Sequence, residues 1–207
     1  MPSLLSAHFG ALQADIDCVE AFVDGFHFDV MDGQFVPNLT VGAPVLSCLT
    51  SQKPFDAHLM VEKPDILIDD FAKAGAKAVS VHFETCPHIH RTFQHIRHAG
   101  MKAGVALNPA TSFESAKDAI SMADFVLIMS VNPGFGGQQF IPEVLEKVRQ
   151  VRAAHPEKDI QIDGGIHEKT VFKAIEAGAN WIVSGSYFWK SKNKQQAAAI
   201  LRGEQRK

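Results

Sequence analysis

The chain has 207 residues, 46% of them hydrophobic and 21% charged, and its formal net charge is −3. This length suits a single domain, and without a basic excess we expect no nucleic-acid partner. There is no charged leader followed by an apolar core and no apolar run of about 18 residues, so we expect neither secretion nor a membrane span. The cysteines, Cys18, Cys48 and Cys86, are odd in number and lack paired spacing, which suits a reducing, cytoplasmic setting.

Strand-like and helix-like hydrophobic periods alternate along the whole chain. In the first half we expect a strand at 3–5, a helix with Leu12, Ile16, Val19 and Phe22 on one face, a strand at 26–31, a helix at 43–49, a strand at 55–60, a helix at 66–74, a strand at 78–82 and a helix at 89–98. In the second half we expect a strand at 102–107, a helix at 113–119, a strand at 125–129, a helix containing Leu145, Val148 and Val151, a strand at 159–163, a helix at 171–177, a strand at 181–184 and a helix at 195–201.

Eight successive β-then-α units predict a parallel sheet covered by helices, and eight is the number that closes into a barrel. An open, doubly wound sheet is the alternative, but no glycine-rich nucleotide loop follows the first strand. We therefore expect an α/β fold, a single-domain (β/α)8 TIM barrel over residues 1–202, followed by a polar tail at 203–207. In such a barrel the reactive groups collect at the carboxyl ends of the strands.

The segment from Phe26 to Gly33 carries the first candidate groups. Apolar residues alternate with His27, Asp29 and Met31, so these three side chains leave the same face of a strand. A buried histidine beside a buried aspartate needs a partner, because unpaired polar groups in a core cost several kcal/mol. A hydrogen-bonded core pair would suffice for this stretch alone.

Other predicted strand ends add His58 and Asp163. Two imidazoles and two carboxylates from three strands match a divalent metal site, although His58 alone could be a core imidazole and Asp163 alone a turn residue. His82 and Glu84 end a further strand, and we expect them to support the site from behind or to lie on its polar rim. The donors suit several metals, so the sequence does not choose among zinc, manganese, iron and cobalt.

Glycines and methionines surround these strand ends. Glycine lets backbone N–H groups approach an anion, and loops after the last barrel strands commonly grip phosphate, which favours a phosphorylated substrate over simple flexible turns. The methionines are either core filler or an apolar wall around a reactive intermediate. The residues concerned are Gly134, Phe135, Gly136, Gly137, Gly164, Gly165, Gly185 and Ser186 for the phosphate, and Met31, Met60 and Met129 for the wall.

At this point the chain resembles the ribulose-phosphate 3-epimerase family, from Pro2 to about Phe188. The matching motifs are Pro2-Ser3-Leu4-Leu5-Ser6, the stretch 27–38, Asp56-Ala57-His58-Leu59-Met60, the stretch 131–138, Asp163-Gly164-Gly165-Ile166 and Gly185-Ser186. The resemblance implies a metal-dependent TIM barrel of the pentose phosphate pathway that interconverts D-ribulose 5-phosphate and D-xylulose 5-phosphate, and it suggests a homo-oligomer.

The resemblance also implies roles for individual residues. His27, Asp29, His58 and Asp163 would ligate the metal, with Asp29 and Asp163 as the acid/base pair. Ser3 and His58 would contact the sugar, and the glycine sites would hold the phosphate. Two carboxylates suit the reaction, because one base cannot easily serve both faces of the carbon that inverts.

Several residues depart from the family pattern: His8, Gln34, Ala57 and the aromatic run Tyr187-Phe188-Trp189. Gln34 and the aromatic run could reshape the pocket, so the activity class is indicated more firmly than the exact sugar. Two alternatives remain open. One is a 3-epimerase of a ketohexose phosphate such as D-allulose 6-phosphate. The other is a non-catalytic barrel that binds a metal or a phosphosugar. An aldolase of the Schiff-base type is disfavoured, because no lysine lies at a matching strand end.

Overall fold

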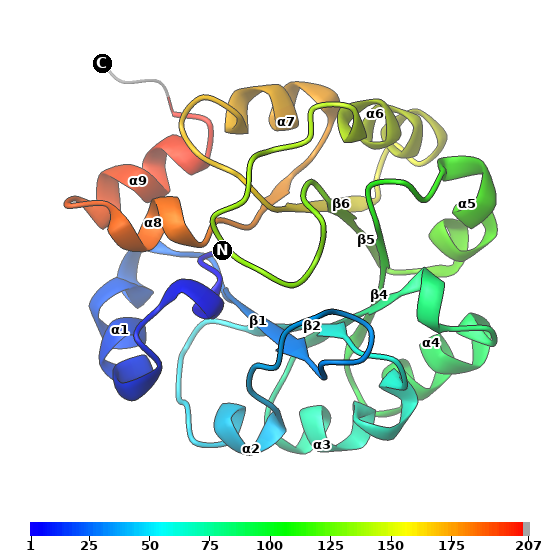
Figure 1. The fold of residues 1–207 in the computed structure, drawn as a ribbon, viewed down its shortest axis with the longest axis horizontal. Helices are drawn as coiled ribbons and strands as arrows, with labels where there is room; N and C mark the ends of the chain where they lie inside the picture. Colours follow the sequence, from blue (N-terminus) through cyan, green and yellow to red (C-terminus); the bar gives the residue numbers. More distant parts are fainter. Residues whose placement is uncertain (205–207) are drawn as a thin grey trace.

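In the computed structural model, which describes residues 1–204, one parallel sheet lies inside a ring of helices (Figure 1). Each strand is hydrogen-bonded to the next one along the chain, so the strand order in space is the order in sequence. The strands are β1 Phe26–Met31, β2 Phe55–Met60, β3 Ala78–His82, β4 Lys102–Leu107, β5 Phe125–Met129, β6 Asp159–Asp163 and β7 Trp181–Ile182. The expected α/β, TIM-barrel-like single domain is thereby confirmed.

The segment before β1 joins the two edges of the sheet. Pro2 forms a parallel bridge with Ser184, and Ser3 forms one with His27. The Ser3 N–H donates to the Ser184 carbonyl at 3.1 Å, and the His27 N–H donates to the Pro2 carbonyl at 3.0 Å. The barrel therefore closes through isolated bridges where the sequence predicted its first full strand.

The predicted strand at 3–5 is wrong beyond Ser3. Leu4–Ser6 is a 3-10 helix, because the Ser3 hydroxyl accepts the Leu5 N–H at 3.2 Å and caps that turn. The predicted last strand is also shorter than expected: β7 ends at Ile182, and Ser184 contributes only its bridge to Pro2.

Helices follow the strands and cover the outside of the barrel (Figure 1). They are α1 Leu12–Val19, α2 Ala43–Leu46, α3 Ile68–Lys73, α4 Ile89–His98, α5 Phe113–Met122, α6 Val144–Ala154, α7 Val171–Ala177, α8 Ser186–Lys190 and α9 Lys194–Leu201. The 3-10 helices are η1 Leu4–Ser6, η2 Phe9–Ala11, η3 Glu20–Phe22, η4 Pro64–Ile66 and η5 Phe83–Thr85. The sequence predicted α4 and α7 with these bounds, but it missed α8.

The first two residues of the expected polar tail at 203–207 cap the C-terminal end of helix α9. Gly203 has φ +87, and its N–H donates to the Ile200 carbonyl at 2.9 Å. The Glu204 N–H donates to the Ala199 carbonyl at 3.1 Å, which completes a Schellman motif at the end of α9. Residues 205–207 of the expected tail lie outside the described residues.

The strands are buried on both faces, and the two faces differ in chemistry. On β1, Phe26, Phe28 and Val30 belong to the main hydrophobic core, and the Phe28 ring packs edge-on against Phe71 of α3 at 6.3 Å. The alternate side chains of β1, His27 and Asp29, are buried too and point into the barrel. On β1 the period of two in the sequence therefore separates a hydrophobic outer face from a polar inner face.

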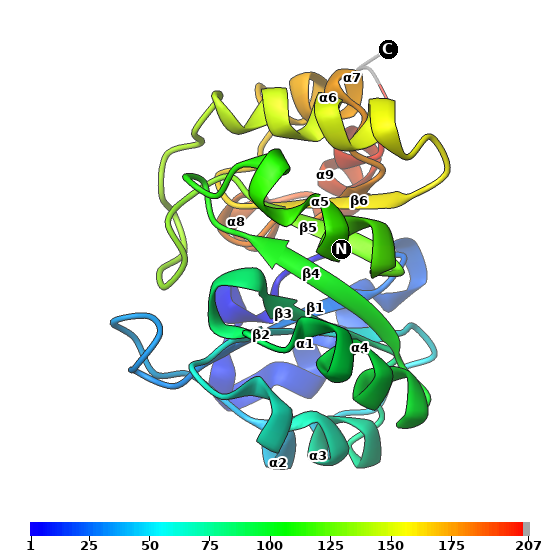
Figure 2. The ribbon, with the colours of Figure 1, turned by 90° about the vertical axis from the view of Figure 1, so that its right-hand side faces the viewer.

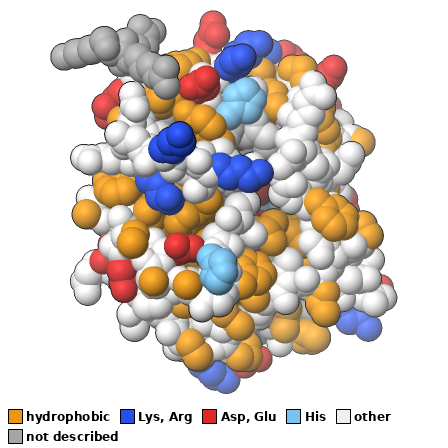
Figure 3. Space-filling view, turned by 60° about the vertical axis from the view of Figure 1, so that its left-hand side comes forward, with side chains coloured by type: hydrophobic (Ala, Val, Ile, Leu, Met, Phe, Trp, Pro, Cys, Tyr) orange, Lys and Arg blue, Asp and Glu red, His pale blue; other side chains and the backbone are white. Residues whose placement is uncertain are grey.

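The side view shows that the loop after β1 and the loop after β5 extend from the same end of the barrel (Figure 2). This is the end at which the parallel strands finish. The face shown in Figure 3 carries acidic and basic side chains interspersed with hydrophobic ones. Among residues 1–204, no helix has the length and apolar character needed to cross a bilayer.

Candidate active site

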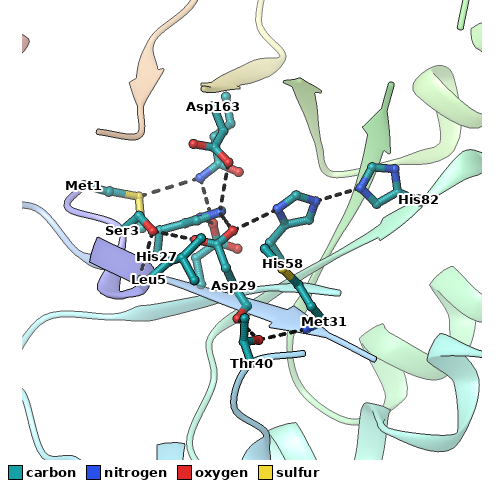
Figure 4. Close-up of polar contacts among 12 residues, drawn as sticks. Met1, Ser3, Leu5, His27, Asp29, Met31, Thr40, His58, His82 and Asp163 are labelled. Atoms are coloured by element: carbon teal, nitrogen blue, oxygen red, sulfur yellow. Dashed lines mark hydrogen bonds and ion pairs between the residues drawn. The ribbon is translucent and has the colours of Figure 1, made fainter. Parts of the chain in front are cut away.

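Four side chains that the sequence singled out meet inside the barrel (Figure 4). His27 and Asp29 come from β1, His58 from β2, and Asp163 from the last position of β6. One possible ligand atom from each lies within 4.8 Å of the other three. The register of the sheet brings them together, because Asp29 pairs directly with His58 and the barrel closure carries β6 round toward β1.

The closest contacts in this group centre on Asp29. Its Oδ1 lies 3.3 Å from His27 Nε2 and 3.3 Å from His58 Nδ1. Its Oδ2 accepts the Ser3 hydroxyl at 2.5 Å. The second carboxylate lies further away, with Asp163 Oδ2 at 3.9 Å from His27 Nε2. Asp29 therefore offers one oxygen to the cluster while Ser3 holds the other.

The surroundings of His27 would suit a metal ligand. Its Nδ1 lies 2.9 Å from Asp56 Oδ2, which also accepts the Gln161 side-chain amide at 2.7 Å. Its Nε2 is fully buried and has no hydrogen-bond partner among the described residues, although Asp29 lies beside it. A histidine that donates one ring N–H to a carboxylate and turns the other nitrogen to a site is the usual arrangement at metal centres.

The donor set fits a divalent cation. Two imidazole nitrogens and two carboxylates suit zinc and the neighbouring transition metals. Ligand bonds of about 2.0–2.2 Å keep two donors on one ion within about 4.4 Å of each other. Shifts of a few tenths of an ångström therefore suffice for His27, Asp29, His58 and Asp163 to share one ion.

Behind His58 a second histidine continues the polar chain. His58 Nε2 lies 2.9 Å from His82 Nε2, and His82 Nδ1 lies 3.1 Å from Glu84 Oε2. Burial lowers the pKa of His82 to about 4, despite the opposing hydrogen bond to Glu84. Burial also raises the pKa of Glu84, but the bonds from His82 and Thr111 outweigh it and set that pKa at about 2. The structure thus places His82 and Glu84 behind the cluster.

The two carboxylates at the site have opposite electrostatic surroundings. Burial and the negative charge of Asp29 together raise the pKa of Asp163 to about 7. Burial also acts to raise the pKa of Asp29, but the charge of the adjacent His27 outweighs it and holds that pKa well below its usual range. For His27, burial acts to lower the pKa, but the adjacent carboxylates outweigh it and hold the pKa well above 6.5. Asp163 therefore keeps its proton up to a pH of about 7, whereas Asp29 stays ionised.

A cavity of about 190 Å³ opens above the cluster at the carboxyl ends of the strands. Twelve of the thirteen residues that we expected to bind substrate line it: Ser3, Met31, Met60, Met129, Gly134, Phe135, Gly136, Gly137, Gly164, Gly165, Gly185 and Ser186. The thirteenth, His58, is fully buried and lies beneath the cavity rather than in its wall. Asp29 and Asp163 both reach the lining.

Two glycines of the cavity lining lie tightly against neighbouring side chains. Gly164 has φ +116, and a Cβ built on it would meet Val131 Cγ2 at 2.5 Å. A Cβ on Gly185 would meet Ser6 Oγ at 2.6 Å. The Ser130 hydroxyl lies within hydrogen-bond distance of both the Asp163 and the Gly164 carbonyl, at 2.9 and 2.7 Å. Only glycine fits at these two positions of the cavity lining, because any larger residue would overlap Val131 or Ser6.

Some residues at the site escaped the sequence analysis. Asp56 and Gln161 are buried partners of His27. Asp56 and His58 are two positions apart on one strand, as are His27 and Asp29. This repeated spacing is the sequence signal that would have identified Asp56. His167 and Tyr187 also line the cavity, but no motif marked His167.

The departures from the family pattern lie in different surroundings. His8 and Gln34 are exposed and do not line the cavity, while Ala57 belongs to the core between sheet and helices. In the aromatic run, Trp189 of α8 donates its indole N–H to the Ser3 carbonyl at 2.7 Å. This bulky residue therefore steadies the serine whose hydroxyl holds Asp29.

Comparison with known proteins adds to this geometry. A model of the ribulose-phosphate 3-epimerase family matches residues 1–189. The chain is 46% identical to the ribulose-phosphate 3-epimerase of Bacillus subtilis, covering 98% of this chain and 97% of that protein. The chain belongs to the ribulose-phosphate 3-epimerase family. It is also 44% identical to the chloroplastic ribulose-5-phosphate-3-epimerase of Arabidopsis thaliana, covering 99% of this chain and 76% of that protein. The resemblance carried by the motifs is confirmed, and the protein is an enzyme of the epimerase class.

Solved structures share the fold at much lower sequence identity. A 3-hexulose-6-phosphate synthase aligns with a TM-score of 0.73 and 18% identity, covering 98% of each chain. The tryptophan synthase α-subunit of Pyrococcus furiosus aligns with a TM-score of 0.73 and 13% identity, covering 98% of this chain and 96% of that one. These likenesses support the TIM-barrel architecture and carry no argument about the reaction.

Proposed function

We propose that the protein interconverts D-ribulose 5-phosphate and D-xylulose 5-phosphate by epimerisation at C3, with Asp29 and Asp163 as the acid/base pair. The observation that carries this proposal is the pair itself. Two buried carboxyl groups with opposite pKa shifts face one cavity from strands that are not neighbours in the sheet. Family membership supplies the substrate class.

The reaction needs proton transfer on both faces of one carbon. The C3 proton lies next to a ketone, and its removal by one carboxylate gives an enediolate. Return of a proton from the other carboxyl group, on the opposite face, inverts C3. Asp163 has a pKa near neutrality and can carry a proton to the carbon, whereas the charged Asp29 can accept one. In the reverse direction the two roles exchange.

Other residues of the chain hold the substrate in place. Ser3 fixes Asp29 through its 2.5 Å hydrogen bond and lies in the cavity wall, within reach of the sugar. Met31, Met60 and Met129 form an apolar wall that offers no exchangeable protons near C3. The backbone around Gly164 and Gly185 would bind the phosphate, and the loop Gly134–Gly137 would cover it.

A divalent ion held by His27, Asp29, His58 and Asp163 would polarise the C2 carbonyl and stabilise the charge of the enediolate, which is worth several kcal/mol in such reactions. The buried Nε2 of His27 without a hydrogen-bond partner supports a ligand at this point. The donor set does not select among zinc, manganese, iron and cobalt.

A coupled assay for xylulose 5-phosphate formed from ribulose 5-phosphate tests the proposed reaction. Rates with allulose 6-phosphate, measured side by side, test the ketohexose phosphate alternative. A non-catalytic barrel would bind either sugar without exchanging the C3 proton for solvent deuterium. We also infer a homo-oligomer from the family resemblance, which light scattering tests. The three free thiols, Cys18, Cys48 and Cys86, suit a reducing compartment such as the cytoplasm.

A further inference from the structure

A series of three polar contacts connects the candidate metal site with Glu84 in η5, the 3-10 helix that follows β3. It links Asp29 to His58 at 3.3 Å, His58 to His82 at 2.9 Å, and His82 to Glu84 at 3.1 Å. Both histidines are fully buried, so water does not compete for these contacts. Phe35 covers His82, with ring centroids 4.7 Å apart. Carboxylates stand at both ends of this series.

The number of protons available decides the direction of the hydrogen bonds. Two neutral imidazoles carry one N–H proton each, but three contacts need a proton. A carboxylate is an acceptor only. The contact that lacks a proton is therefore the one at which a cation can take the proton's place.

Glu84 fixes which contact that is. Its Oε1 accepts the Asn108 N–H at 2.9 Å and the Thr111 hydroxyl, so Oε2 is left to accept from His82 Nδ1. His82 then has a bare Nε2, which accepts from His58 Nε2–H. His58 in turn has a bare Nδ1, and this is the nitrogen that faces Asp29.

We propose that Glu84 and His82 are positioning residues, which hold His58 in the tautomer whose bare Nδ1 faces the metal. This inference rests on the proposed metal site, and it assigns to Glu84 a role that acts through two histidines. Neither His82 nor Glu84 lines the cavity, so neither is a catalytic residue.

Glu84→Gln is the sharpest test, because it changes the hydrogen bonding with almost no change in shape. Asn108 N–H and Thr111 would hold the amide oxygen in the place of Oε1, so the amide N–H2 would donate to His82 Nδ1. His82 would then donate from Nε2, and His58 would carry its proton on Nδ1. Each of the three contacts would then be a complete hydrogen bond, so a metal ion could bind His58 only by breaking one of them.

The expected result is a loss of zinc affinity of about 10- to 100-fold in Glu84→Gln, measured by calorimetry. The matched control Glu114→Gln, on the exposed face of α5, should keep the affinity of the unaltered protein. Imidazole ¹⁵N shifts give a second readout that a packing role would not move. In the zinc-loaded unaltered protein we expect His82 to be protonated at Nδ1, and in metal-free Glu84→Gln at Nε2.

A second pair of variants covers the case in which Glu84→Gln does not fold. His82→Gln can still accept from His58 and donate to Glu84, and it should restore much of the affinity lost in His82→Leu. Equal affinities in Glu84→Gln and the unaltered protein, equal losses in both His82 variants, or a His82 proton on Nε2 in the zinc-loaded protein would overturn the inference alone. Failure of the unaltered protein to bind zinc, manganese, iron or cobalt would overturn the proposed metal site and this inference with it.

Discussion

A carboxylate oxygen of Asp29 lies within 4.8 Å of one of Asp163, although 134 positions separate the two residues in the chain. The charge of His27 holds Asp29 in its ionised form, while burial and the negative charge of Asp29 raise the pKa of Asp163 to about 7. Two like charges this close inside a barrel repel each other unless a cation or a proton lies between them. This relationship underlies the first two predictions.

The contribution of Asp163 to the stability of the metal-free protein should fall as the pH rises from about 4 to about 7. Folded Asp163 has a pKa of about 7 against 3.8 in the unfolded chain, so between these values the folded state binds more protons. Asp163→Asn removes this dependence. Thermal unfolding with a chelator present should therefore show that the stability of Asp163→Asn, relative to that of the unaltered protein, increases from pH 5 to pH 8. A constant difference across this range would contradict the raised pKa.

Removal of the metal should abolish most of the activity. Without a cation, the charge that develops on the substrate loses a stabilisation of several kcal/mol. Turnover should drop after exhaustive chelation and return when zinc, manganese, iron or cobalt is added. Full turnover in protein shown by elemental analysis to hold no metal would count against the proposed site.

Asp56→Ala should destabilise the protein by about 3–5 kcal/mol, because it leaves buried polar partners uncompensated. Asp56 is 2% exposed, and its Oδ2 serves both His27 and Gln161. Urea unfolding measures the loss. Asp118→Ala, on the exposed face of α5, is the control and should change the free energy of unfolding by no more than about 0.5 kcal/mol. Similar values for the two variants would show that His27 does not depend on Asp56.

Gly164→Ala should weaken both the fold and substrate binding. The new methyl group would meet Val131 at 2.5 Å, and the backbone has φ +116, a strain that costs about 1–3 kcal/mol. We expect a lower free energy of unfolding and a raised KM for the phosphorylated sugar. Gly42→Ala is the matched control, since φ is −131 and its nearest neighbour would lie 3.6 Å away. An unchanged KM in Gly164→Ala would show that the backbone at Gly164 does not bind the phosphate.

Much of the site could be predicted from local patterns in the sequence. The alternation around His27 and Asp29 assigned both to one face of a strand, and the rule that reactive groups gather at the strand ends of a barrel added His58 and Asp163. Sheet register then brought the four together, which local pattern alone could not show.

The parts that the sequence missed depend on contacts between distant segments. Leu4–Ser6 is helical because Ser3 caps it, and the same serine closes the barrel against His27. Helix α8 follows Gly185 directly and is rich in aromatic residues, so no apolar period marked it. The roles of Asp56 and Gln161 appear only when β2 and β6 are placed around β1.

The central claim is that Asp29 and Asp163 serve opposite faces of one carbon, and Asp163→Asn tests it most directly. In D2O, with proton NMR as the readout, the unaltered enzyme should interconvert the two pentulose 5-phosphates and exchange the C3 proton of both. Asp163→Asn should lose interconversion by at least about 100-fold. It should still exchange the C3 proton of one epimer, through Asp29, without inversion. Near-normal interconversion by this variant, or equal exchange of both epimers, would contradict the account.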